Sequence, residues 1–166
     1  METQLEYILR KNLKPENIVF IEQHPELFEE LVLLANSDKP LAYRATSLLW
    51  GCISDNDPRI NPYIDNIVNN IHQKDVSHQR ELLKLLLKIN CKEEHIPLIF
   101  DLCVNMWLNN SQPSVRFTAF KMMMKLSIKY PELVNEISQL TQDKYMGNLS
   151  KTAQKSIIKM AKGRVL

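Results

Sequence analysis

Four prolines recur along the chain at spacings of 37, 35 and 34 residues, and each precedes an apolar run. Proline suits the first turn of a helix because that turn needs no backbone N–H and proline's φ already has a helical value. The residues two, six and nine positions after each proline are all apolar, which places them on one helix face. The prolines are Pro25, Pro62, Pro97 and Pro131, and the apolar residues are Leu27, Leu31, Leu34, Ile64, Val68, Ile71, Ile99, Cys103, Met106, Leu133, Ile137 and Leu140. The pattern predicts the same amphipathic helix four times.

A second helix is predicted after each of these, at 39–53, 76–90, 113–129 and 149–162. Each segment contains three mostly apolar residues in a row, flanked mainly by polar ones. Successive helical residues point about 100° apart, so such a helix is packed on several sides and exposes only a narrow stripe. The repeated stretches are 47–51, 84–88, 121–125 and 155–159.

The predicted unit is thus a helix pair of 34 to 37 residues, repeated four times over 24–164. Residues 1–23 are less regular, and we expect two short cap helices there, at 3–12 and 15–23. No strand pattern is found. The length of 166 residues fits one domain, so we predict a single all-α domain over 1–166.

This pattern resembles the HEAT or armadillo-type α-solenoid family, and the resemblance covers about residues 24–164. It implies a right-handed α-α superhelix of about four antiparallel helix pairs. The family often pairs an Asp in the turn with an Arg in the second helix, and Asp38 with Arg44, Asp75 with Arg80, and Ser111 with Arg116 resemble this ladder. The arginines lie 36 residues apart while the apolar frame repeats at 37, and Thr152 stands near the fourth position. The periods alone also admit a tetratricopeptide array.

The exposed stripe of the second helices is rich in cations. In the resembled family these helices line the concave groove, so the resemblance implies a basic ridge there. The candidate partner-binding residues are Arg44, Lys84, Lys88, Lys121, Lys125, Lys155, Lys159 and Lys162. The other interpretation is a solvated lysine face, because Ser47, Gly51 and Glu81 interrupt the ridge. We expect Trp50 and Trp107 to pack in the core or between helices.

Charge is unevenly distributed, although the net charge is only +2. Residues 1–38 contain 8 acidic and 3 basic residues, whereas 113–166 contain 10 basic and 3 acidic residues. A concentrated positive field accelerates association with an anionic partner and makes its binding salt-sensitive. Nucleic acid, an acidic protein segment or an anionic surface would each qualify.

Several function classes lack the residues they need. Three scattered glycines cannot form a phosphate-binding loop or a nucleophile elbow, and no catalytic carboxylate pair or metal-ligand set is found. We therefore expect no enzyme activity, no cofactor and no metal. Three cysteines without a paired motif favour the reducing cytoplasm. Without a signal sequence or membrane span, Met1 is expected to be the mature start. The lysines on the last helix favour a monomer.

Two functions remain. The first is a noncatalytic helical-repeat scaffold whose basic groove binds a protein or acidic peptide. The second is a protein that binds the nucleic-acid backbone, related to the HEAT-like DNA alkylation repair proteins. Those proteins are longer and carry aromatic and acidic groove residues, whereas the stripe here has neither Trp nor Asp. The identity of the partner and the HEAT or armadillo subfamily stay open.

Overall fold

The computed structural model describes residues 3–163, and every regular element within that range is helical. The chain divides into two compact units, 1–91 and 92–166. The described part of the first unit contains α1 (Gln4–Arg10), α2 (Pro15–Gln23), α3 (Glu26–Ala35), α4 (Ala42–Cys52), α5 (Ile64–Asn70) and α6 (Val76–Leu87). The described part of the second contains α7 (Ile96–Asn109), α8 (Pro113–Lys129), α9 (Val134–Gln139), α10 (Asp143–Met146) and α11 (Lys151–Gly163). The all-α prediction is confirmed, and the four predicted second helices are α4, α6, α8 and α11.

The predicted prolines do mark the starts of the first helices. Pro25 immediately precedes α3, and Pro97 is the second residue of α7. Pro62 and Pro131 lie in short 3₁₀ turns, Pro58–Tyr63 and Pro131–Leu133, that lead directly into α5 and α9. Turns of 3₁₀ helix are frequent at the N-termini of α-helices, so these two turns act as the first turns of α5 and α9.

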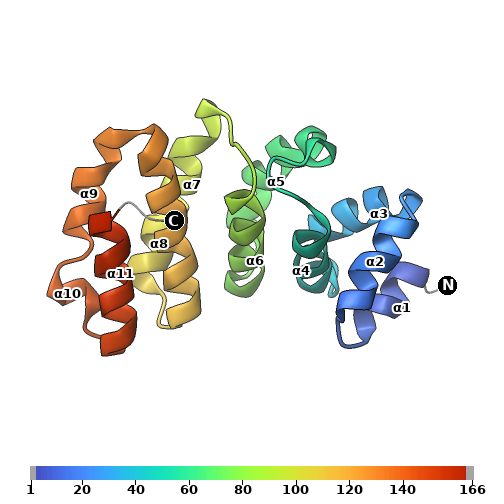
Figure 1. Cartoon of the computed structure of the whole chain (residues 1–166), viewed down its shortest axis with the longest axis horizontal. Coiled ribbons are helices and arrows are strands. Elements are labelled where there is room, and N and C mark those ends of the chain that lie inside the picture. The colour runs from blue at the N-terminus through green and yellow to red at the C-terminus, as the bar shows by residue number, and fades with distance from the viewer. Residues whose placement is uncertain (1–2, 164–166) are drawn as a thin grey trace. The chain divides into compact units, whose positions relative to one another are not determined.

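The first unit stacks three helix pairs, because the predicted cap is itself a short pair (Figure 1). Helix α1 contacts α3, α2 contacts α4, and α4 contacts α6. Gly51 of α4 explains how α2 can approach so closely. A Cβ at Gly51 would lie 2.7 Å from the Cδ1 atom of Ile18 on α2. The two cap helices predicted at 3–12 and 15–23 are thus α1 and α2, and they pack against α3 and α4.

The predicted apolar frame forms the core of both units. Ten of the twelve positions on the first helices are buried, and Leu27 and Leu133 are partly exposed. The apolar stretches of the second helices are buried at Leu48 and Leu49, Leu85 and Leu86, and Met122 to Met124. The prediction for Trp107 is confirmed, since it is fully buried, but that for Trp50 is wrong because its side chain is 39% exposed.

Buried polar side chains tie successive helices together. His78 on α6 has its Nε2 atom 2.8 Å from the Ala35 carbonyl oxygen and 3.0 Å from the Thr46 hydroxyl. Arg116 on α8 donates to the carbonyl oxygens of Trp107 and Tyr145, and its guanidinium lies over the Trp107 ring. In a dry interior, such hydrogen bonds specify one arrangement of the helices.

The expected Asp–Arg ladder is replaced by other contacts at its first and third positions. Asp38 pairs with Lys74, and Arg44 donates to the carbonyl oxygen of Lys11. Arg116 uses the two backbone carbonyls described above instead of Ser111. Asp75 accepts hydrogen bonds from the first amides of α6 and so caps that helix.

We predict that Met123→Ala will destabilise the protein by about 2 to 5 kcal/mol, because removing most of a fully buried side chain leaves a cavity in its place. Ile128→Ala on the same helix is the matched control. Its side chain is 59% exposed, so we expect a change within about 0.5 kcal/mol. Urea unfolding of both variants checks this. Equal effects would show that the assigned faces of α8 are wrong.

We predict that stability falls as the pH drops below about 6.5, the ordinary pKa of histidine. Burial lowers the pKa of His78, and the opposing effect of the Ala35 hydrogen bond is smaller. Lys74 also lowers this pKa, while Asp75 and Asp38 raise it. The unfolded chain therefore binds the proton more readily, and acid favours unfolding until the pH reaches the folded pKa.

The measurement is urea unfolding between about pH 7 and pH 5, above the ordinary pKa of carboxylates. His78→Gln should show a smaller loss of stability over this range than wild type, whatever its stability at pH 7. An identical slope in both proteins would contradict the assignment to His78.

Candidate partner-binding surface

The sequence-predicted cations are divided between the two units. The first unit contains Arg44 on α4, Lys84 in the last turn of α6, and Lys88 directly after α6. Lys121 and Lys125 on α8, and Lys155, Lys159 and Lys162 on α11, belong to the second.

Arg44 is used to attach α1 and α2 to the next helix pair. Its guanidinium donates to the Lys11 carbonyl oxygen, and its side chain is only partly exposed. Gly51, seven residues further along the same stripe, lies against Ile18 of α2. The N-terminal pair thus packs against the part of α4 that the sequence pattern assigned to the exposed stripe.

Lys88 has a structural contact at the end of the neighbouring helix. Its Nζ atom donates to the carbonyl oxygens of Trp50 at 2.7 Å and Ile53 at 2.9 Å. These carbonyls lie at the C-terminal end of α4, where a helix leaves carbonyl groups without intrahelical partners. A cation there is also favoured by the helix dipole.

Lys84 takes part in an ion-pair cluster around Glu81. The Glu81 side chain is almost completely buried, and its two oxygens accept from Arg80 at 3.0 Å and Lys84 at 2.9 Å. A buried carboxylate needs such partners, because water no longer stabilises its charge. The acidic residue that interrupts the predicted ridge is therefore enclosed by two cations.

The structure places Trp50, Tyr43 and Arg80 in or beside this cluster, although the sequence pattern did not assign them to the candidate surface. Trp50 lies under Lys84 and Lys88, whose Nζ atoms are 5.2 and 4.3 Å from its ring centroid. Tyr43, seven residues before Trp50, is also 39% exposed, and its hydroxyl lies 3.5 Å from Arg80. The sequence did contain a signal for this face, because Tyr43, Ser47 and Trp50 are spaced so that they lie on one side of a helix.

Lysines in the second unit are concentrated on α8 and α11. Lys121 and Lys125 are partly exposed, whereas Lys155, Lys159 and Lys162 are exposed. The two helices together contain eight basic residues and no acidic one. Of these eight, Arg116 is buried, so the lysines account for the positive surface.

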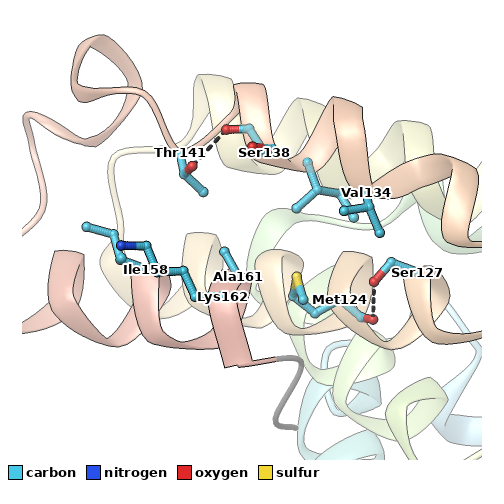
Figure 2. Close-up of a pocket in the computed structure, with 9 residues that line it drawn as sticks. Met124, Ser127, Val134, Ser138, Thr141, Ile158, Ala161 and Lys162 are labelled. Atoms are coloured by element: carbon cyan, nitrogen blue, oxygen red, sulfur yellow. Dashed lines mark hydrogen bonds between the residues drawn. The ribbon is translucent and has the colours of Figure 1, made fainter.

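A pocket of about 170 Å³ lies between α8, α9 and α11 (Figure 2). Val134, Ile137 and Ile158 contribute its apolar lining, and Lys162 also lines it. The hydroxyls of Ser127 and Thr141 donate to backbone carbonyls of their own helical turns. Helix α9 has 6 residues against 14 in α7.

Two of the three thiols are unsuited to nucleophilic chemistry. Burial raises the pKa of Cys52 to about 11, with a smaller contribution from Glu22. Burial alone raises the pKa of Cys103 still further. Both thiols stay protonated at neutral pH, and a protonated thiol is a weak nucleophile.

Among residues 3–163, no helix has the length and apolar character needed to cross a membrane. Comparison with family models finds a match to the HEAT repeat domain over residues 1–164. No curated protein and no solved structure matches the chain.

We predict that Lys88→Met will destabilise the first unit by about 1 kcal/mol, because it removes two charge-assisted hydrogen bonds to carbonyl groups. Lys155→Met is the control, since its exposed side chain should change stability by less than about 0.5 kcal/mol. Urea unfolding measures both. A larger effect at Lys155 would mean that the structural and surface lysines are assigned the wrong way round.

Proposed function

The chain belongs to the HEAT repeat domain family, and on that premise we propose that it is a noncatalytic scaffold that binds an acidic protein or peptide. Repeat proteins of this kind expose long surfaces formed by successive helices, and they commonly bind other proteins there. We assign the contact to the lysines of the second helices. In the second unit these are Lys121, Lys125, Lys155, Lys159 and Lys162. A separate set in the first unit comprises Arg44, Lys84 and Lys88.

The observation that carries this proposal is the complete absence of acidic residues from α8 and α11. Lysines four residues apart on one helix repel each other by about 0.2 to 0.5 kcal/mol per pair. Lys121 with Lys125, and Lys155 with Lys159, are two such pairs. An anionic partner would offset this repulsion.

The family match over 1–164 supports treating 1–166 as one functional domain. Free, buried thiols at Cys52 and Cys103 support a reducing compartment, and we propose the cytoplasm. The exposed lysines on α11 support a monomer, because like charges oppose self-association through that helix.

Binding should be measured by fluorescence anisotropy with a labelled peptide of Glu and Ser and with a DNA duplex, at about 50 and 200 mM salt. We expect peptide binding to weaken with salt, and to weaken about tenfold further in Lys155→Glu/Lys159→Glu. The matched control is Lys14→Glu/Lys39→Glu, which makes the same charge change at exposed residues of the first unit.

Equal losses in the two variants would reduce the effect to net charge and overturn the assignment to α11. Duplex binding that is tighter than peptide binding, and that is lost in the α11 variant, would favour the nucleic-acid function instead. Circular dichroism confirms that each variant is folded.

A further inference from the structure

Two aromatic side chains are exposed along one face of α4. Tyr43 and Trp50 are each 39% exposed, and Ser47 lies between them at the intervening helical position. A single exposed apolar side chain needs no explanation. Here, however, the Trp50 ring lies against Lys84 and Lys88, and the Tyr43 hydroxyl lies 3.5 Å from Arg80. Exposed aromatic side chains beside cations are typical of binding surfaces.

The cations beside these rings are held in place by other contacts. Arg80 and Lys84 donate to the buried Glu81 carboxylate, and Lys88 donates to the carbonyl oxygens of Trp50 and Ile53. Side chains that are already ordered lose less conformational entropy when a ligand binds. Three cations and one carboxylate leave the cluster positively charged.

We infer that this surface docks an acidic peptide segment that carries a bulky apolar or aromatic residue beside its carboxylates. We call it the Trp50 surface, and it is formed by Tyr43, Trp50, Arg80, Lys84 and Lys88. The ligand class rests on the proposed function, while the site itself lies entirely within the first unit. The ammonium groups contact the carboxylates, and the Tyr43 and Trp50 rings contact the apolar side chain.

A peptide fits the Trp50 surface better than a nucleic acid does. A nucleic acid carries a charge at every nucleotide along its path. Residues 1–38 of the same unit contain 8 acidic and 3 basic residues, which repel an extended polyanion. A short acidic segment needs only the local positive cluster.

The first test uses the intrinsic fluorescence of the wild-type protein. The chain has two tryptophans, and Trp107 is fully buried, so quenching by acrylamide reports mainly on Trp50. The probe is a short peptide of Glu and Ser with one central Phe. We expect it to protect Trp50 from quenching, and to do so more strongly than the same peptide with Ala in place of Phe. Unchanged quenching at saturation would overturn the inference.

The second test compares Tyr43→Ala/Trp50→Ala with the control Tyr7→Ala/Leu33→Ala, which removes two exposed apolar side chains from α1 and α3. By anisotropy, we expect the first variant to bind the Phe peptide about tenfold more weakly and the control to bind it as wild type does. Should the first variant fail to fold, Trp50→Phe replaces it in the anisotropy measurement.

The two proposals fail in different ways. Loss of peptide binding only in the α11 double variant would support the proposed function and overturn the Trp50 surface. Loss only in Tyr43→Ala/Trp50→Ala would support the Trp50 surface and overturn the α11 site. Tighter binding of a single-stranded oligonucleotide that depends on Trp50 would overturn the choice of a peptide.

Discussion

Burial of one apolar helix face against the next pair along the chain is the interaction on which each unit depends. A pair such as α3 and α4 exposes apolar side chains on more than one side and cannot bury them by itself. Stacking α2 against α4, and α4 against α6, covers them. Gly51 permits the first of these contacts, and the buried hydrogen bond between His78 and Thr46 joins α6 to α4 in the second. Specific polar contacts thus select the geometry that apolar burial makes favourable.

The described helices near the two ends of the chain meet the stacking requirement differently. At the N-terminal side, the short pair α1 and α2 covers α3 and α4, and Arg44 fastens it through the Lys11 carbonyl. In the second unit, a pocket lies between α8, α9 and α11. The outer face of α11 is instead made polar by lysines.

The fold could be predicted because helical periodicity is a local property of the sequence. The recurrence of Leu31, Val68, Cys103 and Ile137 in one frame identified the buried faces, and all four are buried. The side-chain partners could not be predicted, since they depend on residues about 30 positions away. Arg44 reaches Lys11, and Lys88 reaches the last turn of α4. Periodicity placed these cations on an exposed stripe. It could not show that their side chains would donate to carbonyl oxygens at the ends of neighbouring helices.

Trp50 shows that residues at equivalent positions of the repeat can differ in burial, and it also marks a difference between the two candidate surfaces. Its equivalent in α8, Met124, is buried, so equivalent positions in the apolar frame differ in what covers them. On α4, the Trp50 ring is partly covered by the side chains of Lys84 and Lys88.

The two candidate surfaces differ in how their lysines are held. Lys84 and Lys88 are held by Glu81 and by backbone carbonyls, whereas the α11 lysines are exposed to solvent. Exposed charges are screened by salt, while close contact with an aromatic ring is not. The two surfaces therefore differ in the physical basis of any binding they support: electrostatic attraction at α11, and apolar contact in an ordered charged frame at Trp50.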